Sequence, residues 1–160
     1  MRRSLSLPLL ALLLVTGAPA LAQIKNTDAP VDITADGQEV DLKNKVTTYS
    51  GNVIVIQGDM RMRADAVRAE MLDDSNLNKI VANGHVVLDS PSGTITGDAG
   101  TWDFVPHMIT FTGRVVLTKD KDVLRGTVLN YNLDTKQAKF TARGGRVQGL
   151  FSSPQSKPNP

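Results

Sequence analysis

Residues 51–71 read GNVIVIQGDMRMRADAVRAEM, in which a glycine leads into a run of apolar residues, and a Gly-Asp turn separates this run from a second one that alternates apolar and polar residues. Related stretches begin at Gly84 (GHVVLDSPSGTITGDAGTWDF) and at Gly113 (GRVVLTKDKDVLRGTVLNYNL). Each has a glycine, an alternating run, a turn and a second run. Period-two alternation rich in Val, Ile, Thr and aromatic residues is typical of β-strands. The repeated unit is therefore a pair of strands joined by a turn.

The repeat extends over four units of about 30 residues, the last one weaker. The units align on a small residue followed by a polar one, and these polar residues are spaced by 29, 33 and 29 positions. The aligned dipeptides are Ala35-Asp36, Ala64-Asp65, Gly97-Asp98 and Gly126-Thr127. The turns fall at equivalent places in the units, at residues 57–59, 90–93 and 119–122.

The alternation changes phase at the aligned polar residue. Apolar or small residues lie three and one positions before it, but four and six positions after it, from Val40 and Leu42 in the first unit to Tyr131 and Leu133 in the fourth. A β-bulge or a corner between sheets has this effect, because one extra residue changes the side to which every later side chain points. We therefore interpret the aspartates at these positions as structural corner residues.

This pattern predicts an all-β chain folded as an open β-jelly-roll, which is a two-layered β-solenoid of stacked antiparallel strands. Stacked units that do not close leave an unpaired strand at each end. We expect these edges near Val31–Ala35 and near Ala138–Gln148. The last glycine-led segment, Gly144-Gly145-Arg146-Val147, lacks the regular alternation, so the pairing at that end is left open.

The ends of the chain differ in composition from the repeats. Residues 1–22 combine Arg2 and Arg3, a short apolar run and the small-x-small sequence Ala20-Leu21-Ala22, as in a cleavable secretory signal peptide. The apolar run has about a dozen residues, against roughly 20 needed to span a bilayer. We predict one domain over residues 23–151, a disordered Pro-rich tail over 152–160, and a periplasmic location.

Charge and cysteine content exclude several classes. The chain has 18 basic and 16 acidic residues, and without Arg2 and Arg3 the predicted mature chain has no net charge. Its calculated pI is therefore no argument for nucleic-acid binding. With no cysteine, an exported chain must be stabilised by packing and backbone pairing.

No pattern indicates catalysis, a metal or a cofactor. His85 and His107 have no metal-ligand spacing, and no cysteine is available to join them. Asp73-Asp74 lies among turn-forming residues, as expected of a solvated loop. The glycines are spread at repeat spacing and do not form a nucleotide-binding fingerprint. We therefore predict a protein that is not an enzyme.

Two interpretations of the apolar residues remain open. They could form a fully dry β core, or they could line a trough between two sheets that holds acyl chains, since each buried CH₂ contributes roughly 0.8 kcal/mol. The open ends, and the methionine and aromatic residues on the second strands, favour the trough.

The segment VDITADGQEVDLKNKVTTYSGNVIVIQGDMRMRADAVRAE, from Val31 to Glu70, resembles the OstA-like domain of the LptA family. So do FTGRVVL and LRGTVLNYNLDTKQAKF further on, and the resemblance covers about residues 29–150. It implies a periplasmic lipopolysaccharide-transport protein that bridges an inner-membrane exporter and an outer-membrane translocon. It also implies end-to-end stacking through the edge strands, lipid A acyl chains in an apolar groove, and no cofactor. Arg114 and Thr127 depart from the family pattern, which usually has Asn and Asp there.

We therefore predict a groove lined by one face of each repeat. Its predicted lining is Ile33, Tyr49, Val53, Val55, Met62, Val86, Leu88, Ile95, Trp102, Phe104, Ile109, Phe111, Val115, Leu117 and Tyr131. The alternatives are the membrane-anchored subunit of the same machine, and a structural or adhesive β-solenoid with a dry core. A lipid-modifying enzyme is a more distant possibility.

Overall fold

The structure, a computed structural model, describes residues 29–152. That part of the chain is built from strands alone, and it has no helix long and apolar enough to cross a membrane. The strands are β1 (Val31–Thr34), β2 (Gly37–Asp41), β3 (Val46–Gln57), β4 (Met60–Met71), β5 (Leu77–Ser90), β6 (Gly93–Asp103), β7 (Met108–Lys119), β8 (Asp122–Asn132), β9 (Ala138–Thr141) and β10 (Gln148–Leu150). The all-β prediction is confirmed.

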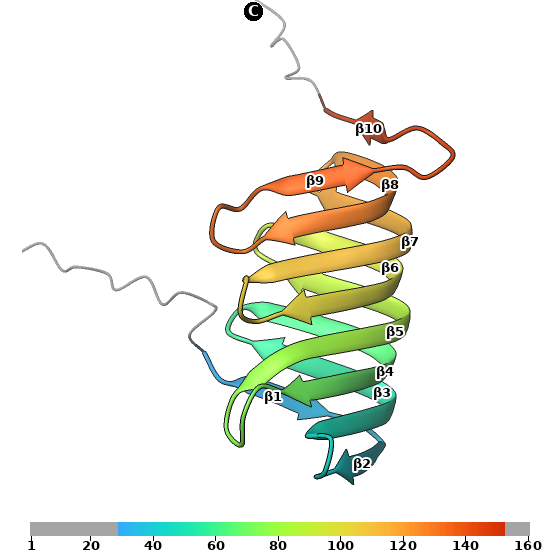
Figure 1. Cartoon of the computed structure of the whole chain (residues 1–160). Helices are drawn as coiled ribbons and strands as arrows, with labels where there is room; N and C mark the ends of the chain where they lie inside the picture. Colours follow the sequence, from blue (N-terminus) through green and yellow to red (C-terminus); the bar gives the residue numbers. More distant parts are fainter. Residues whose placement is uncertain (1–28, 153–160) are drawn as a thin grey trace, which may run out of the picture.

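The strands stack in sequence order along one axis (Figure 1). From β3 to β8, each long strand pairs antiparallel with the strands before and after it. At the N-terminal end β1 and β2 pair with the two halves of β3. At the C-terminal end β10 and β9 pair with the two halves of β8. Each end of the stack is therefore one strand broken in two.

Every long strand bends at a corner in its middle. The pairing register shifts there in each long pair, for example between Ser50 and Val53 and between Thr112 and Val115. The predicted phase change is thus confirmed as a bulged corner. It divides the stack into two layers. The first layer is the half that includes β1, β10 and the turns at 58–59, 91–92 and 120–121. The second layer is the other half, which includes β2 and β9.

The first unit differs from the others in one detail. Val40 and Leu42 occupy positions that are apolar in every unit, but their side chains are 52% and 84% exposed. They follow the corner on β2 and on the turn after it, where no further strand within residues 29–152 covers the end. Apolar pattern alone cannot tell a terminal strand from an internal one, because burial depends on a neighbour that the end of the stack lacks.

The two predicted edges are the terminal strands. Val31–Ala35 contains β1, and Ala138–Gln148 runs from β9 to the start of β10. The irregular segment Gly144–Val147 lies outside both of those strands. The predicted signal peptide lies outside the described residues, as does the predicted tail except for Ser152, which donates hydrogen bonds from N and Oγ to Asp122.

Candidate functional site

The interior between the two layers is lined by ladders of inward-facing side chains. Residues that are directly opposite on neighbouring strands point to the same side of the sheet, so each pairing adds one rung. In the first layer one ladder runs through Ile33, Val55, Met62, Leu88, Ile95, Leu117 and Leu124. In the second layer one runs through Thr47, Ala69, Ile80, Trp102, Ile109, Tyr131 and Ala138. The ladders extend from one end of the stack to the other.

The middle of this interior is closely packed. Met62, Ile109 and Phe111 are 0% exposed, and Trp102 is 1% exposed. The Trp102 ring stacks on that of Phe104, with centroids 5.3 Å apart and planes inclined by 10°. Glycine makes room for Phe111, because a Cβ at Gly97 would lie 3.0 Å from its ring. This part of the structure is a dry core.

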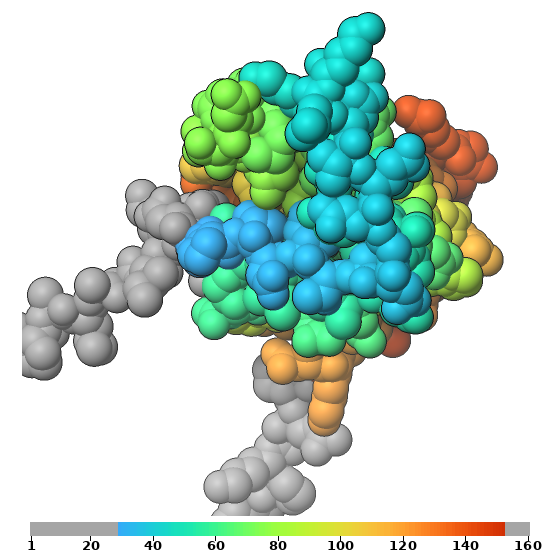
Figure 2. Space-filling model, turned by 90° about the horizontal axis from the view of Figure 1, so that it is seen from below, coloured from blue at the N-terminus to red at the C-terminus, as the bar shows by residue number. Residues whose placement is uncertain are grey.

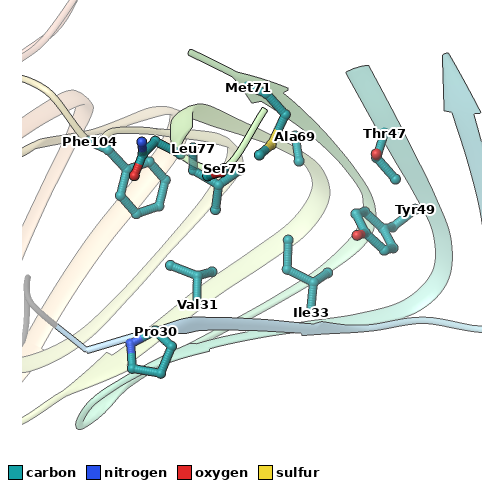
Figure 3. Close-up of a pocket in the computed structure, with 11 residues that line it drawn as sticks. Pro30, Val31, Ile33, Thr47, Tyr49, Ala69, Met71, Ser75, Leu77 and Phe104 are labelled. Carbon is teal, nitrogen blue, oxygen red and sulfur yellow. The ribbon is translucent and has the colours of Figure 1, made fainter. Parts of the chain in front are cut away.

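The N-terminal end of the interior contains a cavity of about 510 Å³. β1 crosses this end of the molecule (Figure 2) and directs Val31 and Ile33 into the cavity (Figure 3). Across from them are Tyr49 on β3 and Phe104, which follows β6. The rest of the lining is Pro30, Thr47, Ala69, Met71, Ser75, Asn76 and Leu77. The volume falls in the range of roughly 300–1,000 Å³ typical of small-molecule sites.

The layers join at the corners, so the side of the stack opposite the corners is a mouth between two rows of turns and loops. Tyr131, on β8 in the second layer, reaches across it. Its Oη donates a hydrogen bond of 3.1 Å to Oγ of Ser92, in the β5–β6 turn of the first layer. Tyr131 and Phe140 are only partly buried, so the interior is also less tightly closed near its C-terminal end.

The interior is uncharged. The buried residues in the described part of the chain are apolar, with the exception of Gln57, which is 3% exposed. Its Nε2 donates a hydrogen bond of 2.9 Å to the Ala29 carbonyl. Ionised groups lie on the outside, because burying an unpaired charge is far more costly than burying an amide that has a partner. Such an interior can accept hydrocarbon, and the residues that line its cavity include no Asp, Glu, Lys, Arg or His.

All fifteen predicted groove residues belong to this one interior, either in its buried cluster or packed against it. The period-two pattern was sufficient to place them. Eight of the cavity residues named above were not included in the predicted lining: Pro30, Val31, Thr47, Ala69, Met71, Ser75, Asn76 and Leu77. Ala69 and Met71 could have been found, since they follow the corner by four and six positions; Asn76 belongs to an irregular loop that carries no such signal.

The corners form a column of polar residues along the outer side of the stack, which we call the corner column. In the first three units an aspartate carboxylate accepts a hydrogen bond from the residue that follows the leading glycine of the next strand. The pairs are Asn52 Nδ2 with Asp36 (2.7 Å), His85 Nδ1 with Asp65 (2.7 Å), and Arg114 Nη2 with Asp98 (2.9 Å). At the fourth corner the Thr127 hydroxyl accepts from the Arg143 backbone N–H at 2.7 Å.

The electrostatics of the column support a structural role. Hydrogen bonds from the Arg114 guanidinium lower the pKa of the Asp98 carboxyl from its usual value. His107 pairs separately with Asp134 at 2.9 Å on the surface. No group of three or more potential ligand side chains that could hold a metal was found within residues 29–152.

These features define a class of protein: an open two-layered β-stack with an uncharged apolar interior. A solved structure of this class is LptH of Pseudomonas aeruginosa, described as the LptA homologous periplasmic component of the conserved lipopolysaccharide transport device. The two superpose with a TM-score of 0.72 over 81% of this chain and 99% of LptH, at 15% sequence identity. At that identity the likeness establishes the fold alone.

Sequence comparison establishes the family. The family described as "LptA/(LptD N-terminal domain) LPS transport protein" matches residues 32–137, more than half of the chain, and the chain therefore belongs to it. The lipopolysaccharide export system protein LptA of Escherichia coli K12 is 28% identical over 153 residues, covering 90% of this chain and 82% of its own. An uncharacterized protein of Rhizobium meliloti is 30% identical over 144 residues, covering 84% and 76%. LptA of Haemophilus influenzae is 24% identical over 144 residues.

Proposed function

We propose that this protein is a periplasmic lipopolysaccharide carrier and one segment of a bridge between the inner and outer membranes. The acyl chains of lipid A lie in the interior between the two layers, and the charged headgroup stays outside. The observation that carries the proposal is the uncharged apolar interior, which follows the whole stack and widens at the N-terminal end into the cavity beneath β1. Membership of the family supports the choice of lipid.

Loading requires the packed centre to open. The layers are joined at the corners but are not covalently linked across the mouth, so they can separate there and admit an acyl chain. Each CH₂ that enters contributes roughly 0.8 kcal/mol, which offsets the cost of separating Trp102 and Phe111 from the side chains packed around them. A ligand shifts such an equilibrium only through its preference for the open state. The cavity is the natural place for a chain to enter first.

A photocrosslinking experiment tests this function with two adjacent residues as a matched pair. Thr47 lines the cavity, whereas the side chain of Thr48 is exposed on the opposite face of β3. With a photoreactive residue at each position in turn, irradiation in cells should attach lipopolysaccharide at position 47 and little or none at 48. Equal labelling, or none at 47 from a folded protein, would rule out lipid in this cavity.

The dry centre also favours a second candidate, a structural β-solenoid that holds no lipid. The same experiment with the photoreactive group at Phe111 separates the two. A loaded trough should be labelled at position 111 as well as at 47, whereas a permanently dry core should be labelled at neither. Purification of the native protein followed by lipid A analysis gives an independent measurement, since a dry-core protein should carry no lipopolysaccharide.

The proposal extends to location and partners. The chain is exported by the signal at residues 1–22, and its partners are an inner-membrane exporter subunit and an outer-membrane translocon with related domains. Copies associate end to end through the β1–β2 and β9–β10 edges, whose outer backbone groups have no further strand to pair with among the described residues. Mass spectrometry of the exported protein should find Gln23 at its N-terminus; retention of residues 1–22 would favour the membrane-anchored alternative. No catalytic step is assigned, since both histidines lie in surface pairs outside the interior.

A further inference from the structure

The corner column ends differently at the two ends of the stack. It begins at Asp36, a carboxylate, and then alternates between aspartates and the hydrogen-bond donors of the following strands. At the C-terminal end Thr127 replaces the aspartate, and the next strand brings Arg143 to this position. The column therefore starts with an anion and ends with a cation.

The last corner is also larger than the others. Elsewhere two residues of the glycine-led strand form the bulge, such as Gly84 and His85 between Asn83 and Val86. Between β9 and β10 the chain uses residues 142–147 instead, which we call the arginine loop. Arg143 and Arg146 are exposed on it, and neither forms an ion pair within the described part of the chain. Nothing lies within 4 Å of a Cβ placed at Gly144 or Gly145, so the loop stands clear of the sheet.

The two edges are opposite in charge along their whole length. Residues 29–41, which include β1 and β2, contain four acidic side chains and no Lys or Arg: Asp32, Asp36, Glu39 and Asp41. Residues 136–151, which include β9 and β10, contain four basic side chains and no Asp or Glu: Lys136, Lys139, Arg143 and Arg146. Two N-terminal edges, or two C-terminal edges, therefore repel each other, whereas an N-terminal edge attracts a C-terminal edge. This favours head-to-tail association of copies.

The strand order fits the same polarity. Directions alternate through the stack, so the broken strand β9–β10 runs antiparallel to the broken strand β1–β2. β10 and β1 both belong to the first layer, and β9 and β2 to the second. Suppose that a second copy stacks on the C-terminal edge and continues the rows of directly opposite residues that run through the first copy. Thr34 of the second copy then lies opposite Gln148 of the first, and its Gln38 lies opposite Phe140. Its Asp36 then falls beside the arginine loop.

We propose that the arginine loop is the recognition element of the C-terminal edge, and that its partner is the acidic N-terminal edge of a second copy of this chain, with Arg143 and Arg146 facing Asp36. This inference rests on the end-to-end association included in the proposed function and assigns its specificity. Backbone pairing between edges is indifferent to sequence, whereas the loop accepts a partner only where a carboxylate occupies the corner.

Charge reversal with a matched control tests the loop. The double variant R143E/R146E should weaken self-association at least about tenfold in sedimentation-velocity experiments, because attraction becomes repulsion at the corner. The control is R61E/R68E, which makes the same charge change on two exposed outward residues of the internal strand β4. Its dissociation constant should stay within about twofold of the wild type. Equal effects of the two variants, or no effect of the first, would overturn the proposal.

Engineered cysteines test the register. The chain contains no cysteine, so T34C/Q148C can form a disulfide only between introduced residues, and in the proposed register they are directly opposite in neighbouring copies. Mild oxidation should give a ladder of covalent oligomers, whereas D32C/Q148C, displaced by two residues, should give far less. Comparable yields would contradict the register. A wild type that stays monomeric would refute self-docking, while lipid labelling at position 47 would still decide the carrier function separately.

Discussion

At the scale of single residues, the corner depends on a glycine and an aspartate that occupy neighbouring strands. Gly51, Gly84 and Gly113 all have positive φ values, between 76° and 97°, which residues with a Cβ adopt at a cost. Each also faces a carboxylate: a Cβ on Gly51 would lie 2.6 Å from Oδ2 of Asp36. The glycine is therefore required twice, for its backbone angle and for the space that the aspartate fills.

A double-mutant cycle on Gly51 and Asp36 separates these two requirements. Gly51→Ala should lower the free energy of unfolding by about 2–3 kcal/mol, through backbone strain and contact with the carboxylate. In the Asp36→Ala background the carboxylate is gone, so the same substitution should cost about 1 kcal/mol less. Urea denaturation measures both values. The control is Gly145→Ala, where the Cβ meets nothing within 4 Å and the change should stay within about 0.5 kcal/mol. If the effects of the two substitutions on the free energy of unfolding were strictly additive, the Asp36 carboxylate would not be the group that opposes a Cβ at position 51.

At the scale of the elements, the mouth between the layers is bridged by the hydrogen bond from Tyr131 to Ser92. Tyr131→Phe keeps the ring but removes the donor, so the β5–β6 turn should open more often and its amide hydrogens should exchange several-fold faster. The expected loss of stability is about 0.5–1.5 kcal/mol. Thr110→Val is the control, because it removes a bond of 3.0 Å to Asn130 that lies within the second layer. Faster exchange in the control alone would show that the Tyr131 bond does not hold the mouth.

The sequence predicts the long strands far better than the ends of the stack. Alternation and the phase change located the strands, the turns and the fifteen interior residues, because each internal strand repeats the same environment. Val40 and Leu42 follow the same pattern but are exposed, since no further strand in the described part of the chain covers them. The mouth contact between Tyr131 and Ser92 joins residues 39 positions apart, at no repeat spacing, and only the three-dimensional arrangement reveals it.

At the scale of the whole molecule, the interior changes from a cavity at the N-terminal end to a dry core in the centre, and substitutions should have different effects along this axis. Phe111 is 0% exposed, so Phe111→Glu would bury an unpaired charge and should unfold the protein. Ile33 is only half-buried at the cavity, where water can reach a carboxylate. Ile33→Glu should therefore leave most of the stability intact, and thermal denaturation of the two variants measures the difference.

The effect of Ile33→Glu on lipid binding should nevertheless be large. A charge beneath β1 opposes the entry of hydrocarbon, and exposing only two CH₂ groups of the lipid to water corresponds to roughly 1.6 kcal/mol, or more than tenfold in affinity. We expect lipopolysaccharide recovered with the purified variant to fall by at least about tenfold. Thr34→Glu is the control: it places the same charge one residue along β1, on the exposed opposite face, and should retain the lipid. Equal losses in the two variants would indicate a general effect of charge on the edge strand, and full retention in both would place the lipid elsewhere. A selective loss at Ile33 would mean that the cavity is where the apolar interior is open to its lipid.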